Sequence, residues 1–218
     1  MDRAMAFINS IFSNYTARIT VAGKDIGELK TEIIRKAIHF LIALCPLMAG
    51  VNKTATVILL MIGTLGYTLM ECLRLSGVRI PVISSLTSMA SRERDFGHFV
   101  MGPVTLGLGA LLALLLYPSQ AAAIAIYALA FGDGIASLIG RLFGKVRPAF
   151  LSGKSIEGSI ACFAVVFISA YMVCGNTYIA LVAAFTAMVT EALPLEDYDN
   201  LAIPVTVGLA VQLASIAF

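Results

Sequence analysis

An acidic residue interrupts an apolar run of this sequence. Residues 121–131, AAAIAIYALAF, are typical of a membrane helix, and Asp133 follows them between two glycines. A carboxylate inside a membrane segment is costly and by default indicates a functional site. The flanking Gly132 and Gly134 permit a local break in the helix and a close approach of its backbone to a ligand. Asp133 is therefore predicted to take part in chemistry.

Small residues recur around Asp133 at every fourth position. A stripe of this kind lets two membrane helices pack closely. Packing therefore explains the stripe as well as ligand binding does, although it leaves Asp133 unexplained. The stripe consists of Gly132, Ala136, Gly140 and Gly144.

Basic residues follow Asp133 before the next apolar run, and their charges suit phosphate groups. The segment SGKS, residues 152–155, is not a P-loop, because Pro148 occupies the position of the first glycine and no strand precedes it. Ser155 and Glu157 have two interpretations of similar weight, a catalytic role or the N-cap and first turn of a helix. The basic residues are Arg141, Lys145, Arg147 and Lys154.

A second polar cluster lies in EIIRKAIH, residues 32–39. Glu32, Arg35, Lys36 and His39 have the spacing i, i+3, i+4 and i+7, so they share one face of a helix. Cations that anchor a helix end at the membrane surface would also explain Arg35 and Lys36. They would not explain His39, which lies one turn deeper in the apolar run.

A third cluster is acidic and stands before the last apolar run, in EALPLEDYDN, residues 191–200. Four carboxylates in this short stretch repel one another unless a cation is present. Oxygen ligands suit Mg²⁺, which usually also binds phosphates. The charged segment SRERDFGH, residues 91–98, is interpreted mainly as a solvated run. The acidic residues are Glu191, Glu196, Asp197 and Asp199, with Asn200 beside them.

The composition indicates an integral membrane protein. Hydrophobic residues make up 59% of the chain and charged residues 13%, with a mean hydropathy of +0.92, whereas soluble domains carry about 25% charged residues. The net charge of +2 is too small to indicate a nucleic-acid partner. The four cysteines are dispersed in apolar runs and are predicted to be buried apolar residues rather than disulfide or zinc residues.

The predicted fold is all-α and polytopic, with about seven transmembrane helices. Residues 1–25 are predicted to form an interfacial amphipathic helix, and residues 26–218 one membrane catalytic domain. Apolar runs of about 15–20 residues mark the spans. The runs are Ala37–Val51, Thr54–Leu73, Phe99–Tyr117, Ala121–Ile139, Ile156–Cys174, Thr177–Ala192 and Leu201–Phe218.

Seven spans place almost all charged residues on one side of the membrane. Of the 15 basic residues only Lys53 falls on the other side, so the basic side is predicted to be cytoplasmic, with the N-terminus inside and the C-terminus outside. The acidic residues gather on the same side. A transporter normally places polar groups near the midplane. Chemistry gathered at one interface instead suits an enzyme that uses a lipid head and a soluble co-substrate, in phosphoryl or nucleotidyl transfer.

The polar segments follow one another in the order EIIRKAIHF, GDGIASLIGRLFGK, GKSIEGS and EALPLEDYDNLAIP. Together they resemble the dolichol kinase and phytol kinase family of CTP-dependent lipid kinases, which includes the yeast-type diacylglycerol kinase. The resemblance spans roughly residues 32–204. It implies CTP as phosphate donor, Mg²⁺ or another divalent cation, and an isoprenoid alcohol (polyprenol, dolichol or phytol) or diacylglycerol from the inner leaflet as acceptor. Its motif positions are Arg35, Lys36, Asp133, Gly140, Lys154 and Glu157.

Two alternatives remain at this stage. The middle segment also resembles phosphatidate cytidylyltransferases, which make a CDP-lipid. Their C-terminal signature contains histidine, whereas this chain has LEDYDN there, and the difference favours a kinase. The non-enzyme alternative is a small transporter or a structural membrane subunit.

The kinase interpretation assigns hypothetical roles. Asp133 accepts the hydroxyl proton or binds metal. The predicted nucleotide-binding set is Arg35, Lys36, Gly132, Gly134, Gly140, Arg141, Gly144, Lys145, Lys154, Ser155 and Glu157. The predicted metal set is Asp133, Asp197, Asp199 and Glu196. The supporting residues are Glu32, His39, Glu191 and Asn200.

Overall fold

The computed structural model describes residues 31–78, 97–148, 151 and 153–217, and these residues contain helices and no strand. The predicted interfacial helix of residues 1–25 and most of the segment 91–98 lie outside the described residues. The elements are a helix from Thr31 that includes η1 (Ile42–Leu44) and α2 (Cys45–Leu75), then α4 (Gly102–Leu116), α5 (Ser119–Tyr127), η3 (Ala128–Asp133), α6 (Gly134–Leu142), α7 (Ile156–Cys174), α8 (Thr177–Ala192), η5 (Glu196–Tyr198) and α9 (Asp199–Ala217).

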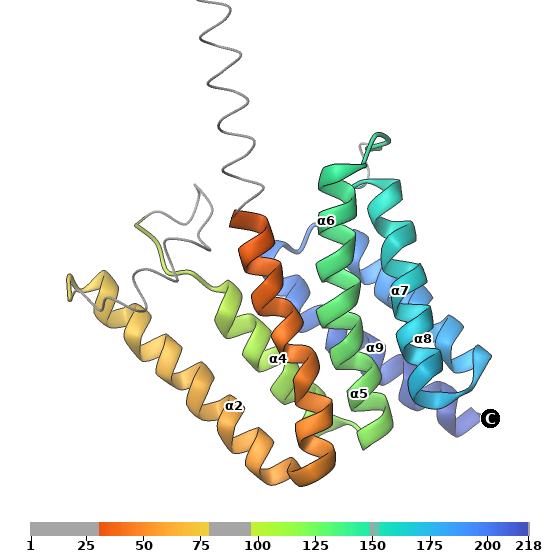
Figure 1. Cartoon of the computed structure of the whole chain (residues 1–218), viewed down its shortest axis with the longest axis horizontal. Coiled ribbons are helices and arrows are strands. Elements are labelled where there is room, and N and C mark those ends of the chain that lie inside the picture. Colours follow the sequence, from red (N-terminus) through yellow and green to blue (C-terminus); the bar gives the residue numbers. More distant parts are fainter. Residues whose placement is uncertain (1–30, 79–96, 149–150, 152, 218) are drawn as a thin grey trace, which may run out of the picture.

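The first long helix is divided at Asn52. Its backbone there is extended, with φ −153° and ψ 100°, and its side chain caps the next turn by accepting a hydrogen bond from the backbone N–H of Ala55 at 3.0 Å. We call residues 31–51 the first arm and residues 53–75 the second arm. The arms diverge from Asn52 in a V, with α4 between them (Figure 1).

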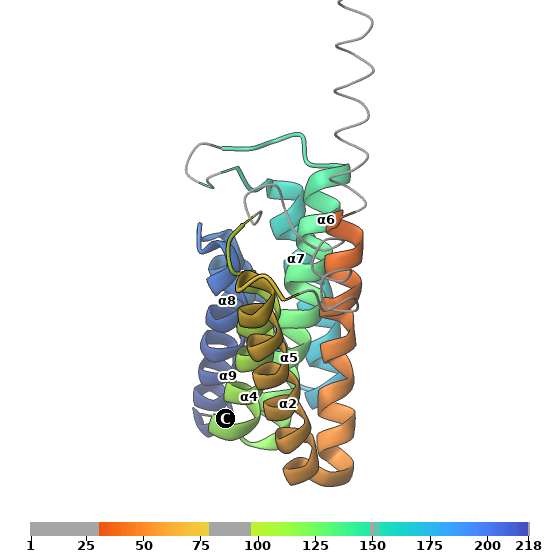
Figure 2. The same ribbon diagram turned by 90° about the vertical axis from the view of Figure 1, so that its left-hand side faces the viewer.

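Four helices are long and apolar enough to cross a membrane, and α4 and α8 are shorter apolar helices. The protein is thus an integral membrane protein with an all-helical described part. Each predicted apolar run corresponds to a helical segment, and α7 and α8 have the predicted bounds. Seven crossings remain a prediction, as does the cytoplasmic side. Figures 1 and 2 show residue 31 and the C-terminus at opposite ends of the bundle. The four long helices are Thr31–Leu75, Ser119–Leu142, Ile156–Cys174 and Glu196–Ala217.

The core surrounds α5 and η3, which continue directly into α6 as one column in the middle of the bundle (Figure 1). The column is buried along α5 and η3, and helices α7, α8 and α9 pack against it. Many of the contacting residues are alanines, which allow close approach of helix backbones. Fully buried examples are Ala125, Ala128, Leu129, Ala180, Ala183, Ala184 and Val207.

Helices α4 and α9 lie in tight contact at Gly109. Pro204 lies inside α9 and has no N–H, so the carbonyl of Asn200 loses its helical donor. A Cβ atom on Gly109 would collide with this carbonyl oxygen. Further along the same contact, the Tyr117 hydroxyl donates a 2.6 Å hydrogen bond to the carbonyl of Val205. A glycine at 109 therefore sets the spacing of the two helices.

Replacing Gly109 by alanine is expected to destabilise the protein, because the new methyl group meets backbone rather than a side chain that can move. Overpacking of this kind costs about 1–3 kcal/mol, or roughly 2–4 °C of melting temperature per kcal/mol in a chain of this size. Gly66→Ala in α2 is the matched control, since nothing lies within 4 Å of its added methyl group. Thermal unfolding in detergent checks the pair, and equal melting temperatures for both variants would contradict the packing argument.

Candidate active site

A cavity of about 360 Å³ lies among the two arms, the start of α4, the end of η3 and the start of α9. Three of the predicted polar clusters contribute to its wall, although they are far apart in the sequence. The other side of the wall is mainly apolar. The lining residues with polar side chains are Arg35, His39, Tyr67, Asp133, Glu196, Asp197, Asp199 and Asn200, and the apolar ones are Ile38, Leu41, Val100, Pro103 and Leu106, with Gly102.

Asp133 is held by two residues of the first arm. The ammonium of Lys36 donates to Oδ2 of Asp133, and Nδ1 of His39 lies 3.3 Å from the same oxygen. All three side chains are nearly inaccessible to solvent, with 1%, 6% and 6% exposed. The aspartate is therefore a buried, paired carboxylate that faces the cavity. Lys36 does not line the cavity, so binding phosphate would require its ammonium to leave Asp133.

The break expected around Asp133 is a π-helical segment. Residues Ala128–Asp133 form it, and the chain continues without a stop into α6. Single π turns inside α-helices occur frequently at functional sites. The ring of Phe131 stacks on Tyr127 at a centroid distance of 5.6 Å and lies 6.0 Å from Phe40 of the first arm. These ring contacts join the π-helical segment to the first arm.

The glycines around Asp133 lie against neighbouring helices. A Cβ on Gly132 would approach Val166 of α7 to 2.8 Å, one on Gly134 would approach Phe40 to 2.6 Å, and one on Gly140 would approach Ser155 Oγ to 2.9 Å. A Cβ on Gly144 would meet the carbonyl of Gly140. The packing alternative accounts for these four glycines, and their part in nucleotide binding stays a prediction.

Arg35 presents a partly unsatisfied guanidinium to the cavity. Its Nη2 donates to Glu32 at 3.0 Å, and the two side chains are 18% and 4% exposed. Its Nε is buried and has no hydrogen-bond partner among the described residues. Buried donors are nearly always paired. An anionic group in the cavity would satisfy this one.

The acidic turn contributes three carboxylates, Glu196, Asp197 and Asp199, to the cavity wall. Glu196 has a φ of 54°, a left-handed conformation that is uncommon outside glycine. Asp199 is within electrostatic reach of Asp133 and Lys36. In the described part of the chain, no group of three or more His, Cys, Asp or Glu residues is arranged to hold a metal ion alone.

Asn200 joins the acidic turn to α4. Its Nδ2 donates to Thr105 Oγ1 at 3.0 Å. Its Oδ1 is buried without a hydrogen-bond partner within the described residues, and the residue lines the cavity. The polar end of the cavity therefore has both a donor, at Arg35, and an acceptor that remain to be satisfied.

Lys154 and Glu191 pair beside the cavity rather than in its wall. Nζ of Lys154 lies 3.2 Å from Oε1 of Glu191 and also donates to the Glu191 carbonyl. This contact ties the loop before α7 to the end of α8. The Oε2 of Glu191 is buried and has no hydrogen-bond partner among the described residues.

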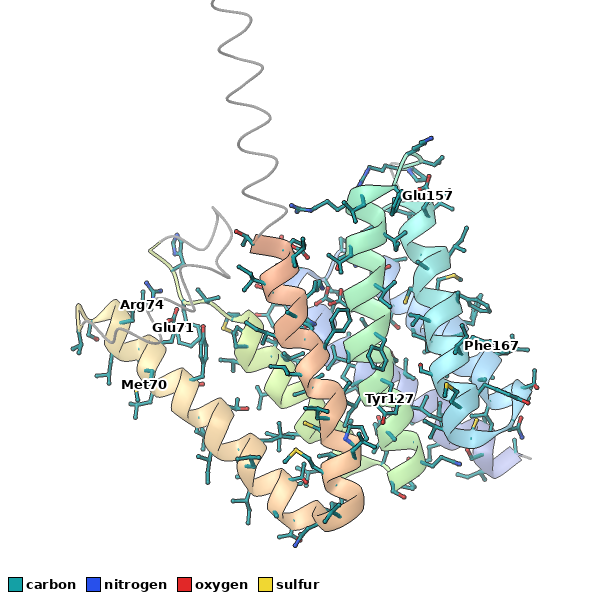
Figure 3. The ribbon with its side chains drawn as sticks, in the orientation of Figure 1. Met70, Glu71, Arg74, Tyr127, Glu157 and Phe167 are labelled. Carbon is teal, nitrogen blue, oxygen red and sulfur yellow. The ribbon has the colours of Figure 1, made fainter. Side chains whose placement is uncertain are left out.

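The loop before α7 is held by its own residues. Glu157, in the first turn of α7, accepts hydrogen bonds from the backbone N–H of Lys145 at 2.9 Å and of Val146 at 3.2 Å. Figure 3 labels Glu157. Arg147 donates to the carbonyls of Gly140 and Gly153. Ser155 caps α7 by accepting from the N–H of Gly158, which confirms the capping interpretation.

Two of the predicted phosphate-binding cations are exposed, Arg141 in the last turn of α6 and Lys145 in the loop that follows. Arg141 and Lys145 are accessible to solvent and do not line the cavity. They could therefore meet a nucleotide only outside the cavity, and their role in phosphate binding stays a prediction. Neither Ser155 nor Glu157 lines the cavity, and their described contacts are those of the capped loop.

The sequence analysis missed the residues that hold the opposite wall. Glu71 is completely buried and accepts from Arg74 Nε at 2.8 Å and from the N–H of Val100 at 3.0 Å. Tyr67 donates to the Val100 carbonyl at 3.3 Å. Figure 3 shows Glu71 and Arg74 at the end of the second arm, beside this segment. The available signal was a carboxylate in an apolar run, three residues before an arginine.

The chain is similar to several known proteins. It is 30% identical to an uncharacterized protein of Methanocaldococcus jannaschii over 136 residues, which cover 61% of this chain and 68% of that protein. It is 28% identical to a probable phytol kinase 1 of Oryza sativa over 165 residues, 66% of this chain and 52% of the relative. It is 25% identical to a CTP-dependent diacylglycerol kinase 1 of Eremothecium gossypii over 206 residues, 81% of this chain and 65% of the relative.

No family model and no solved structure matches the chain. The chain spans about half the length of the phytol kinases that it matches, including that of Arabidopsis thaliana. The matched relatives with described activities are lipid kinases from plants and a fungus. These similarities therefore support a relation of the chain to the CTP-dependent lipid kinase family, which the four sequence segments also resemble.

Proposed function

We propose that this protein is a membrane kinase that transfers the γ-phosphate of CTP to a lipid alcohol, either an isoprenoid alcohol or diacylglycerol. The observation that carries the proposal is the cavity, whose wall combines a guanidinium, several carboxylates and an apolar side. A guanidinium and carboxylates with a bound cation suit the phosphate donor, and an apolar wall suits the lipid acceptor. The relatives' names supply the nucleotide and the acceptor class.

The proposed reaction is a single displacement. The hydroxyl oxygen of the lipid bonds to the γ-phosphorus, the bond from this phosphorus to the β–γ bridging oxygen breaks, and CDP leaves. The transition state of such a transfer is loose, so positioning and charge neutralisation provide most of the catalysis. Among the described lysines and arginines, Arg35 lines the cavity, and it binds the transferred phosphate in this proposal. Arg141 and Lys145 attract the nucleotide to the rim.

Asp133 accepts the proton of the lipid hydroxyl. An ion-paired carboxylate is a weak base, but a loose transition state needs little proton removal before the phosphorus–oxygen bond forms. Lys36 and His39 fix the direction of the carboxylate through their contacts with Oδ2. In this mechanism Lys36 acts through Asp133, and Lys154 acts through Glu191 and the loop that it ties down.

The residues at the acidic turn fit a divalent cation that is bound mainly by the nucleotide. Mg²⁺ prefers one or two carboxylates together with phosphate oxygens and waters. Asp197 and Asp199 would hold it, with Glu196 beside them. When bound, the ion would neutralise charge on the phosphates.

A labelled nucleotide separates this function from the alternatives. The purified chain in bilayers, given γ-labelled CTP and a panel of lipid alcohols, is expected to produce labelled lipid. A CDP-lipid with release of pyrophosphate would instead establish a cytidylyltransferase. Absence of both products with folded protein would leave a transporter or a structural subunit.

Removing charge from the acidic turn should increase the metal requirement. In Asp197→Asn and Asp199→Asn the side chains keep their size, and the half-saturating Mg²⁺ concentration is expected to rise about tenfold or more, as losses of ligands and their partners typically produce. The measurement is a Mg²⁺ titration of lipid phosphorylation at saturating CTP. Wild-type titration curves for both variants would place the metal elsewhere.

The buried pair gives a prediction about stability and activity together. The sequence alone suggests that Asp133→Asn leaves stability intact, but the contact with Lys36 changes this expectation. Neutralising one partner leaves the other charge buried, at a cost of about 3–5 kcal/mol. Asp133→Asn and Lys36→Met should therefore each lower the melting temperature, and the double variant should recover much of the loss.

Activity should follow a different pattern from stability in this cycle. In all variants that lack Asp133, the rate of lipid phosphorylation is expected to fall about a hundredfold or more. This includes the double variant, although its stability is largely restored. Lys53→Met, which removes an exposed lysine at the opposite end of the bundle, is the control. An active, stable Asp133→Asn protein would remove Asp133 from the mechanism.

A further inference from the structure

We propose that the hydrocarbon chain of the acceptor enters the cavity from the side, between the two arms, and that the protein recognises only the part of the chain next to the hydroxyl. This inference rests on the proposed function. It adds the route, the residues that form the opening and the basis of acceptor selectivity. In this proposal the opening lies between Leu41 on the first arm and Tyr67 on the second arm, which line the cavity together with the buried Leu106 of α4.

The apolar wall is continuous with the polar end. On the first arm, Arg35, Ile38, His39 and Leu41 all line the cavity, so one helix passes from the phosphate-binding end to the apolar end. Arg35 and Leu41 are six residues apart, or roughly 9 Å along the helix axis. A hydroxyl near Arg35 therefore places the following carbon atoms beside Ile38 and Leu41.

The exposure of Leu41 shows where the cavity reaches the surface. Leu41 lines the cavity and is also 64% exposed, so the wall ends there. Leu44 and Leu47 follow on the same arm and are 51% and 64% exposed. Residues 40–51 carry no charged side chain and lie in a helix apolar enough to span a membrane. The opening thus faces hydrocarbon, where a lipid chain can leave the cavity without contacting water.

The polar end has a different boundary. Glu196 lines the cavity and is exposed at the turn before α9, and Asp197 lies beside it. A lipid chain would not pass these carboxylates, whereas a hydrated, metal-bound nucleotide would. The two substrates therefore reach the same cavity by separate routes, the nucleotide from water and the lipid from the side.

The size of the cavity limits what is recognised. Small-molecule pockets measure about 300–1,000 Å³, and this one is near the lower limit at about 360 Å³. It must also hold the phosphate that is transferred. Only the first carbons of the acceptor fit inside, and the rest stays in the bilayer. Selectivity should therefore depend on shape near the hydroxyl and become insensitive to further chain length.

A tryptophan at the opening tests the route. Leu41→Trp is expected to raise the apparent KM for a long-chain alcohol about tenfold, the effect of altered fit in an apolar pocket, while the KM for CTP stays within about twofold. Leu47→Trp is the matched control, because Leu47 is equally exposed on the same arm but does not line the cavity. Equal effects of the two variants, or an equal rise in the KM for CTP, would overturn the route.

A series of primary alcohols of increasing length tests the selectivity. The wild-type kcat/KM should rise with the first carbons and then become constant. A sharp optimum at one length would indicate a closed pocket and overturn the inference.

A binding experiment separates this inference from the proposed function. A long-chain alcohol with a photoreactive group near its hydroxyl, added to the full chain in bilayers, should label the segments 38–41 and 103–106. Labelling there without any phosphorylation would support the lipid route and refute the kinase. Phosphorylation with labelling confined to other segments would support the kinase and refute the route.

Discussion

The arrangement of this protein depends on one buried ion pair. Lys36 and Asp133 are 97 residues apart, and both side chains are removed from solvent. Either charge alone would be very costly at this depth, so the state with the first arm docked on the central column is the one in which both are compensated. Docking also brings Phe40 against Gly134 and places Arg35 and His39 in the cavity wall. The pair thus determines where the other polar residues of the arm are presented.

Local signals in the sequence were sufficient to predict most of the helices. The bounds of α7 and α8 follow from features visible in one segment: Ser155 caps α7, the left-handed Gly175 ends it, and the Asn176 side chain caps α8. The turn at Asn52 is similar, because an asparagine can cap the following helix. The small-residue stripe indicated close helix packing, and the structure shows that its glycines lie against α7 and the loop before it. The caps are interactions between near neighbours in the chain, whereas the stripe also packs against residues farther away, such as Ser155, 15 positions from Gly140, and Val166, 34 positions from Gly132.

The pairing within the site could not be predicted in the same way. Arg35 and Lys36 share the polar face of one helix, yet consecutive residues differ by about 100° around a helix axis. That difference is enough for Arg35 to face the cavity while Lys36 is buried against Asp133. The partner of a buried charge depends on which helix approaches, and this is a tertiary property. The hydrogen bonds that Glu71 accepts from Arg74 and from the backbone of Val100 were missed for the same reason.

In the proposed function, the depth of Asp133 connects the two substrates. A lipid hydroxyl stays near the membrane surface because its chain is held in hydrocarbon, and a nucleotide stays in water because of its charges. A base that serves both must lie just inside the apolar boundary, where an isolated carboxylate is costly. Pairing with Lys36 makes the unit neutral and offsets this cost, and the π turn presents the carboxylate to the cavity without ending the helix. The acidic turn and Arg35, which would meet the nucleotide in this proposal, can then remain at the polar end of the same cavity. If the proposed function is correct, the burial of the pair and the position of the other polar residues at one end of the cavity both follow from one requirement, that a phosphate be passed across the boundary between water and lipid.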